Sequence, residues 1–262
     1  MRVCLCRVRL RLCLCRRWPL SRSVSTSFDL PRFELCQRQA DALRGARSRL
    51  LRRAGIEQRN TIVEIGAGWG IVANELCSRT GRPVVALDRR PQPSDAPLDQ
   101  SVDWVVGHAE ELPMASESVD LLFAQFTFLW LDLPKSIAEV VRVLAPGGIV
   151  SVIEPDYGGL MEFPEKIVTR PVWIAALERV RADPLVGRKL PGKFADAGLK
   201  VETRFADRYE TADPCRLDFL TELPLSEQEQ QRIEPIQQWL KLHPRAGTSH
   251  LPLWMVLGEK PG

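Results

Sequence analysis

The sequence predicts a three-layer α/β sandwich with a mostly parallel sheet of seven strands. Short runs of apolar and β-branched residues alternate with segments of helical periodicity. Continuous apolar runs are typical of strands covered on both faces, as the strands of a parallel sheet are. A chain of 262 residues can bury one large core, and we expect a single domain over residues 29–262 behind a tail over residues 1–28.

The first half of the domain carries most of this alternation. A helix is expected over residues 33–54, where apolar residues recur every three or four positions until Gly55. The segments after it are expected to form a strand, a helix, three strands, a helix and a fifth strand. Their expected ranges are 61–66, 69–79, 82–88, 101–107, 118–125, 133–144 and 147–155.

The pattern changes after Pro155. Helices are expected at 165–182, 188–199 and 226–242, and strands at 200–209 and 251–260. Ser226 and Glu229 have the spacing of a capping box, which favours a helix start at that point. The segment of about forty residues between the last two strands is too long for a hairpin turn. We therefore expect a substrate lid within residues 157–250.

The charge of the chain is unevenly distributed. Its formal net charge is +3, but residues 1–28 hold seven arginines and no acidic residue, which leaves 29 basic and 33 acidic residues in the domain. A mildly acidic domain argues against a broad nucleic-acid-binding surface. We expect no nucleic-acid partner, and the sequence leaves the oligomeric state open.

The tail over residues 1–28 has three interpretations. Its Arg-rich, Ser-rich and acid-free composition is that of a mitochondrial transit peptide, whereas the alternation of Arg with apolar residues suits a strand. The third interpretation is that these residues are upstream sequence wrongly included in the chain. No apolar run approaches the ~20 residues that a membrane span needs. We expect a cytoplasmic protein, or a mitochondrial one if the tail is a transit peptide.

The cysteines predict no metal site. Four of the seven lie in the tail as the C-x-C pairs Cys4/Cys6 and Cys13/Cys15. Zinc sites normally use wider spacing, and the interleaved arginines would repel a cation. The other cysteines, at positions 36, 77 and 215, are expected to be reduced.

The stretch VEIGAGWG, residues 63–70, is the first segment that indicates a ligand. A glycine-rich turn between a strand and a helix lets the backbone approach a ligand and directs helix N–H groups at it. The spacing G-x-G-x-G differs from the dinucleotide fingerprint G-x-G-x-x-G, and Glu64 just before it suits a cationic ligand. Asp88, at the end of the second strand, can accept both hydroxyls of a ribose. Together they predict a nucleoside ligand.

Two later segments narrow the choice of ligand. GHAEELP, residues 107–113, follows the third strand, and LAPGG, residues 144–148, precedes the fifth. With the glycine turn and Asp88, this set resembles the class I S-adenosylmethionine-dependent methyltransferases, in particular the type 11 group related to ubiquinone and menaquinone biosynthesis. The resemblance covers about residues 55–156. It implies a Rossmann-like methyltransferase fold, S-adenosylmethionine as the cofactor, and a small-molecule methyl acceptor.

The resemblance also implies residue roles along the cofactor. The glycine turn would bind the methionine moiety, Asp88 the ribose, the segment after the third strand the adenine, and the end of the fourth strand the methyl-donor pocket. The implied cofactor-binding residues are Glu64, Gly66, Ala67, Gly68, Asp88, His108, Ala109, Glu110 and Gln125. His108 stands where the family most often has aspartate, and a neutral imidazole accepts through only one nitrogen. An adenine ligand and a surface histidine both stay open for this residue.

The acceptor is expected beyond the carboxyl ends of the fourth and fifth strands, where open α/β sheets bind ligands. Trp130 and Tyr157 are expected to line its pocket, and Phe126 and Phe128 to belong to the core. Trp254 is also expected in the core.

Asp156 and Tyr157 are the candidate catalytic residues. Asp156 or Glu154 could act as a base on an oxygen or nitrogen nucleophile, although Glu154 better fits a loop anchor. The motif N/D-P-P-Y/F of base and glutamine methylation does not occur at the end of the fourth strand, which favours a small-molecule acceptor. The apolar and aromatic content of the later segments would suit an acceptor that is partly hydrophobic, and it would suit ordinary packing equally well.

Two other functions remain as alternatives. One is a methyltransferase-like assembly or regulatory factor without catalysis, which the intact Glu64, glycine turn and Asp88 disfavour. The other is an NAD(P)-linked oxidoreductase in which Arg89 and Arg90 bind a 2′-phosphate. Its glycine spacing is one residue short, and no Tyr-x-x-x-Lys pair occurs.

Overall fold

The computed structural model describes residues 29–206, 210–211 and 214–262. The expectations for the tail over residues 1–28, and for the last residues of the strand over 200–209, lie outside these ranges. Among the helices that are described, none combines the length and the apolar character needed to cross a membrane.

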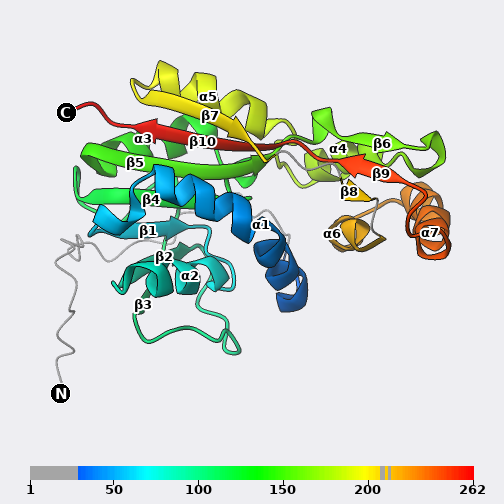
Figure 1. Ribbon diagram of the computed structural model, residues 1–262, viewed down its shortest axis with the longest axis horizontal. Helices are drawn as coiled ribbons and strands as arrows, with labels where there is room; N and C mark the ends of the chain where they lie inside the picture. The colour runs from blue at the N-terminus through cyan, green and yellow to red at the C-terminus, as the bar shows by residue number, and fades with distance from the viewer. Residues whose placement is uncertain (1–28, 207–209, 212–213) are drawn as a thin grey trace.

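A seven-stranded sheet forms the centre of the molecule, in the strand order β3-β2-β1-β4-β5-β10-β7 (Figure 1). Its parallel part pairs β1 with β2 and β4, β2 with β3, and β4 with β5, while β10 runs antiparallel to β5 and β7. The strands are β1 (Ile62–Ile65), β2 (Val84–Asp88), β3 (Val102–Val106), β4 (Val119–Gln125), β5 (Leu144–Pro155), β7 (Lys200–Phe205) and β10 (Leu253–Glu259). The predicted mostly parallel seven-stranded sheet is confirmed.

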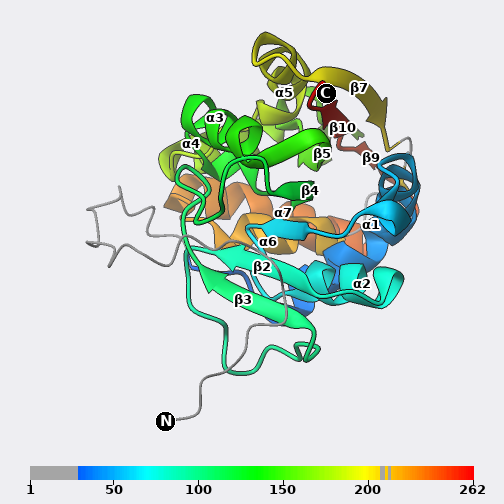
Figure 2. The same ribbon diagram turned by 90° about the vertical axis from the view of Figure 1, so that its left-hand side faces the viewer.

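Helices cover both faces of this sheet, as Figure 2 shows, with α1 and α2 on one side and α3 and α5 on the other. The helices are α1 (Phe33–Arg53), α2 (Ile71–Thr80), α3 (Leu133–Val143), α4 (Arg170–Arg179), α5 (Val186–Asp196), α6 (Asp218–Glu222) and α7 (Glu227–Leu242). Successive strand residues point to opposite faces. On β1, Val63 and Ile65 therefore join the core under α3 and α5, whereas Ile62 joins the core under α1 and α2.

The helix caps follow the sequence signals closely. At the start of α7 the Ser226 hydroxyl accepts from the backbone N–H of Glu229 at 3.3 Å, and the Glu229 carboxylate accepts from the Ser226 N–H at 2.7 Å. This reciprocal arrangement is the predicted capping box. At the start of α3, the Asp132 side chain accepts from the N–H of Lys135 at 3.1 Å.

The region after Pro155 differs from the expectation in two respects. The helix expected over 165–182 is divided into a 3₁₀ turn, Glu165–Ile167, and α4, which has Pro171 in its first turn. A second sheet, in the order β6-β9-β8, was not predicted; it is built from β6 (Met161–Phe163), β9 (Thr248–His250) and β8 (Glu210–Thr211). Strands of two or three residues are too short to produce a periodic sequence pattern.

This second sheet lies with α4, α6 and α7 at one end of the molecule, on the right in Figure 1. Strand β10 begins beside the last residue of β5, with Leu253 opposite Pro155. The segments between β5 and α5 and between β7 and β10, together called the insertion, therefore extend from the edge of the main sheet at which the parallel strands end. That edge is where open α/β sheets bind their ligands.

Candidate functional site

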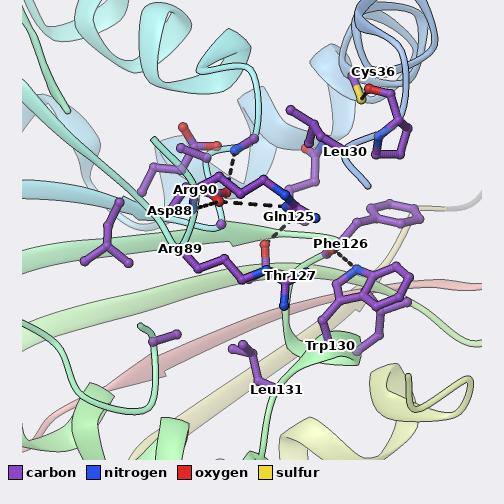
Figure 3. A pocket seen from close by; sticks show the side chains of 18 of the residues that line it. Leu30, Cys36, Asp88, Arg89, Arg90, Gln125, Phe126, Thr127, Trp130 and Leu131 are labelled. Atoms are coloured by element: carbon purple, nitrogen blue, oxygen red, sulfur yellow. Dashed lines mark hydrogen bonds and ion pairs between the residues drawn. The ribbon is translucent and has the colours of Figure 1, made fainter. Parts of the chain in front are cut away.

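A cavity of about 760 Å³ opens at the carboxyl ends of the parallel strands (Figure 3). Its walls come from the glycine turn after β1, the ends of β2 and β4, the connection between β3 and β4, the start of α1, and the insertion. Its size is within the range of small-molecule and cofactor pockets. All nine residues implied as cofactor ligands line this one cavity.

The glycine turn is closed by backbone hydrogen bonds onto β2. The N–H groups of Gly66 and Ala67 donate to the Leu87 carbonyl at 2.8 and 3.1 Å. Gly66 and Gly68 have φ values of 69° and 57°, which residues with a β-carbon rarely adopt. A β-carbon at Gly66 would also overlap the side chain of Thr127. This turn therefore requires glycine for its conformation and for its approach to β4.

Asp88, at the end of β2, holds the same turn by a hydrogen bond. Its Oδ2 accepts from the Gly68 N–H at 2.9 Å, and its Oδ1 accepts from the Arg90 N–H at 2.9 Å. The side chain is buried but lines the cavity. A carboxylate has about four acceptor sites. Asp88 can therefore hold the turn and still accept hydrogen bonds from a ligand.

Glu64 lies buried on the face of β1 that α1 and α2 cover, and it lines the cavity. Its Oε2 has no hydrogen-bonding partner among the described residues. Burial raises the pKa of Glu64 to about 8, and the nearby Arg47 guanidinium opposes this rise. Such a carboxylate is stabilised in its charged form by any cation that enters the cavity beside it.

Arg47 of α1 is a residue that the sequence analysis missed. It is 1% exposed, and its guanidinium donates to Glu75 on α2, to the Gln125 side chain at 3.0 Å and to the Ala40 carbonyl at 3.0 Å. It thereby joins α1, α2 and the end of β4 beneath the cavity. The signal was an arginine on the apolar face of the first helix, four residues after Leu43 and three before Leu50.

The connection between β3 and β4 forms another part of the wall. His108, Ala109 and Glu110 line the cavity, and the N–H of Gly107 donates to the Asp88 carbonyl at 2.9 Å. Arg89 also lines it. The segment over 107–111 therefore lies next to the end of β2.

Aromatic side chains line the opposite part of the cavity. Figure 3 shows Phe126 and Trp130 together on one side, away from Asp88, and the Trp130 Nε1 donates to the Phe126 carbonyl at 3.1 Å. Tyr157 also lines the cavity and stacks on Trp173, with ring centroids 4.6 Å apart. Phe128 is fully buried in the core, as predicted.

The placement of Phe126 corrects an expectation. It was expected in the core, but it lies at φ 53°, is only partly buried and lines the cavity. The reason is the sharp turn of the chain directly after β4. Trp254, also expected in the core, is partly buried and meets Phe205 edge to face at 4.5 Å.

Neither acidic residue at the end of β5 is among the lining residues. The Glu154 Oε1 accepts from the N–H groups of Thr127 and Phe128 at 2.6 and 2.7 Å, so this residue anchors the loop after β4. Asp156 is 3% exposed and accepts from the Arg188 Nε at 2.7 Å. The structure therefore does not bring Asp156, a candidate base, to the cavity with Tyr157, because its carboxylate is turned toward α5.

The insertion contributes wall residues that the sequence analysis did not identify. These side chains are Trp173 and Leu177 on α4, Arg181 directly after α4, and Phe219 and Leu223 at α6. Their segments were expected as part of a lid, but no local motif distinguishes them. Within the described ranges, no group of three or more His, Cys, Asp or Glu side chains could hold a metal ion.

Comparison with known proteins identifies relatives for this chain. The family model described as "Methyltransferase domain" matches residues 63–152. The chain is 33% identical over 147 residues to the biotin biosynthesis bifunctional protein BioHC of Cellvibrio japonicus, which covers 54% of this chain and 28% of that protein. It is 27% identical over 203 residues to an uncharacterized methyltransferase of Schizosaccharomyces pombe, and the match covers 73% of this chain and 78% of that protein. The match thus spans less than a third of BioHC.

Solved structures share the fold. A protein of Bacillus halodurans aligns with a TM-score of 0.60 at 17% identity, over 82% of this chain and 98% of that one. A second solved structure is phosphoethanolamine N-methyltransferase 2 of Haemonchus contortus in complex with S-adenosylhomocysteine. It aligns with a TM-score of 0.51 at 16% identity, over 78% of this chain and 49% of that one. At these identities the likeness concerns the fold, and the predicted three-layer fold is confirmed.

Proposed function

Since the chain is a member of the class I S-adenosylmethionine-dependent methyltransferases of type 11, we propose that it transfers a methyl group from S-adenosylmethionine to a small, partly hydrophobic acceptor. The observation that carries this proposal is the convergence of all nine implied cofactor ligands on one cavity. Aromatic side chains, Phe126, Trp130 and Tyr157 among them, line the same cavity.

The chain's own residues fit this cofactor. The Oε2 of Glu64 is buried, unpartnered and next to the cavity, which suits the positively charged amino group of the methionine moiety. The glycine turn would lie along the same moiety, and Asp88 would accept from the ribose hydroxyls. Ala109 and Glu110 would lie along the adenine, with His108 beside them.

S-adenosylmethionine supplies an electrophilic methyl group on a positively charged sulfur. The protein's contribution is to hold the two reactants in line and to exclude water. Phe126, Trp130 and Tyr157 would provide the dry wall at which the acceptor meets the donor. Because the positive charge disappears during transfer, nearby carboxylates act mainly in binding and orientation.

We also propose that the insertion, within residues 157–250, acts as the substrate lid of a single domain over residues 29–262. Support comes from its lining residues Trp173, Leu177 and Phe219, which lie far along the chain from the cofactor motifs. Loops of this length in compact domains are commonly binding elements.

Titration calorimetry with S-adenosylmethionine and with NADPH tests the proposal. S-adenosylmethionine should bind, and Asp88→Ala should weaken its binding by about 1–3 kcal/mol through loss of charge-assisted hydrogen bonds. Asp95→Ala, a change at an exposed carboxylate outside the cavity, is the matched control. No binding of S-adenosylmethionine at millimolar concentration, or binding of NADPH instead, would overturn the proposal.

The acceptor can be sought with methyl-labelled S-adenosylmethionine added to cell extract, followed by identification of the labelled product. The Asp88→Ala protein serves as the negative control in this experiment. Labelling that does not depend on Asp88 would contradict its assigned role.

A further inference from the structure

Acidic and basic residues both line the cavity, and their positions bear on the acceptor. The part assigned to the cofactor is lined by four acidic residues, Glu64, Asp88, Glu110 and Glu111, and by Arg89 and Arg90 directly after β2. S-adenosylmethionine carries positive charge on its sulfur and on its amino group. The buried carboxylates of Glu64 and Asp88 on that side are therefore electrostatically matched to the donor.

The aromatic part of the cavity has a different character. Trp173 and Leu177 of α4 are buried there, and Tyr157 stacks on Trp173. The charged residue that the insertion adds to the wall is Arg181. The part of the wall that the insertion contributes is thus apolar apart from Arg181, which is exposed.

Arg181 is held in place by the backbone around it. Its own N–H donates to the Glu178 carbonyl at 2.9 Å, and the Asp183 N–H donates to the Leu129 carbonyl at 2.7 Å. Its φ of 62° lies in the left-handed region, which is costly for a residue with a β-carbon. Phe126, with φ 53°, is a second such residue in the same wall.

Arg181 is exposed, and its guanidinium makes no hydrogen bond or ion pair with the residues that the structure describes. Its neighbours along the chain are different: Arg179 pairs with Glu229 at 2.9 Å, and Arg188 pairs with Asp156 at 2.7 Å. A strained, unpaired arginine at the mouth of an apolar pocket is suited to bind an anion on an apolar molecule.

The polar groups near this part of the cavity are not suited to remove a proton from the acceptor. Glu154 accepts from backbone N–H groups, Asp156 pairs with Arg188, and Asp132 pairs with Lys135 at 3.3 Å. Burial raises the pKa of Tyr157, so its hydroxyl stays protonated at neutral pH and can donate a hydrogen bond. A nucleophile that is already deprotonated at neutral pH fits this environment.

We propose that the methyl acceptor is an apolar carboxylic acid, bound through its carboxylate by Arg181 and methylated on a carboxylate oxygen. This inference rests on the proposed function. In the transfer, a lone pair of the oxygen forms the new O–CH₃ bond as the C–S bond breaks, and the bonding pair returns to sulfur. The products are a neutral methyl ester and S-adenosylhomocysteine, and no proton moves. A guanidinium can hold one carboxylate oxygen while the other attacks.

The test compares acids with their uncharged amides. Decanoate and 4-phenylbutyrate, each beside its primary amide, are titrated into the protein in the presence of S-adenosylhomocysteine. At least one acid should bind at least tenfold more tightly than its amide, as a charge-assisted contact predicts. Arg181→Gln should remove this preference, Arg181→Lys should retain part of it, and Arg245→Gln should leave it intact. Arg245 is an exposed arginine outside the cavity.

A second readout is the chemistry of the product. The acid that binds most tightly is incubated with methyl-labelled S-adenosylmethionine, and the label should be released as methanol by mild alkali, as from an ester. Acids that bind no better than their amides, a preference that survives Arg181→Gln, or label that resists alkali would each overturn this inference. If S-adenosylmethionine still binds in those cases, the proposed methyl transfer stands; if it does not bind, both fall.

Discussion

Binding of S-adenosylmethionine is expected to displace a proton from Glu64. Burial raises the pKa of this carboxyl to about 8, against a smaller opposing effect of Arg47. At pH 7 a group with that pKa is about nine tenths protonated in the free protein. The positively charged amino group of the ligand, placed beside the unpartnered Oε2, would favour the ionised form and lower the pKa.

The size of the effect follows from this pKa. If the ligand returns Glu64 to its ordinary range near 4.5, binding releases about 0.9 proton at pH 7, about 0.5 at pH 8 and about 0.1 at pH 9. Titration calorimetry in two buffers of different ionisation enthalpy, phosphate and Tris, measures the number. The slope of binding enthalpy against the ionisation enthalpy of the buffer is the negative of the number of protons released.

Glu64→Gln is the decisive variant because glutamine has nearly the same shape and does not titrate. Its proton release at pH 7 should be lower than that of the unchanged protein by about 0.9. The ligand's own amino group titrates equally in both titrations, so the difference isolates Glu64. Asp95→Asn, at an exposed carboxylate, should behave as the unchanged protein does. Equal release from the unchanged and Glu64→Gln proteins would refute the reasoning.

Two further predictions concern stability. Burial also raises the pKa of Glu154 to about 8. Between about pH 4.5 and 8 the native state therefore binds one more proton than the unfolded chain does. The free energy of unfolding falls as pH rises through that window. Glu154→Gln should therefore raise the melting temperature at pH 8.5 but not at pH 4.5, with a gain of at most about 5 kcal/mol; an equal change at both pH values would contradict this. Arg47→Met should lower the free energy of unfolding in urea by about 3 kcal/mol because it removes the guanidinium that bonds Gln125 and Ala40 and leaves Arg79 as the remaining partner of Glu75. Arg44→Met, at an exposed arginine, should cost no more than about 0.5 kcal/mol, and equal losses from the two variants would refute the role of Arg47.

The cofactor side of the cavity was predictable because its information is local. Gly66 and Gly68 are required by a turn that four neighbouring residues define, and Asp88 follows directly from the end of an apolar strand. Parallel strands present their carboxyl ends at one edge of the sheet. Motifs spaced along residues 63–125 were therefore expected to meet, and all nine cofactor candidates line one cavity.

The acceptor side was predictable only in part. Trp130 and Tyr157 lie next to strand ends and were identified from that position. Trp173, Leu177, Phe219 and Arg181 lie on helices or loops of the insertion, where an aromatic or charged residue in the sequence does not reveal what it faces.

Asp156 is the reverse case: the sequence predicts it as a site residue, but it does not line the cavity. It occupies a position at the end of β5 that resembles a catalytic one in the sequence, but its partner Arg188 comes from α5, 32 residues later. An ion pair between such distant residues forms only when the helix is packed on the sheet. No local sequence pattern therefore predicts it.

The sequence by itself determined the alternation of strands and helices, the glycine turn, and the resemblance to the methyltransferases, since each depends on residues close together in the chain. The tertiary structure alone decided that Arg47 lies buried beneath the cavity, that Asp156 is turned away from it, and that the insertion brings Arg181 to its mouth. These three placements depend on contacts between segments far apart in sequence, and such contacts exist only once the helices have packed against the sheet.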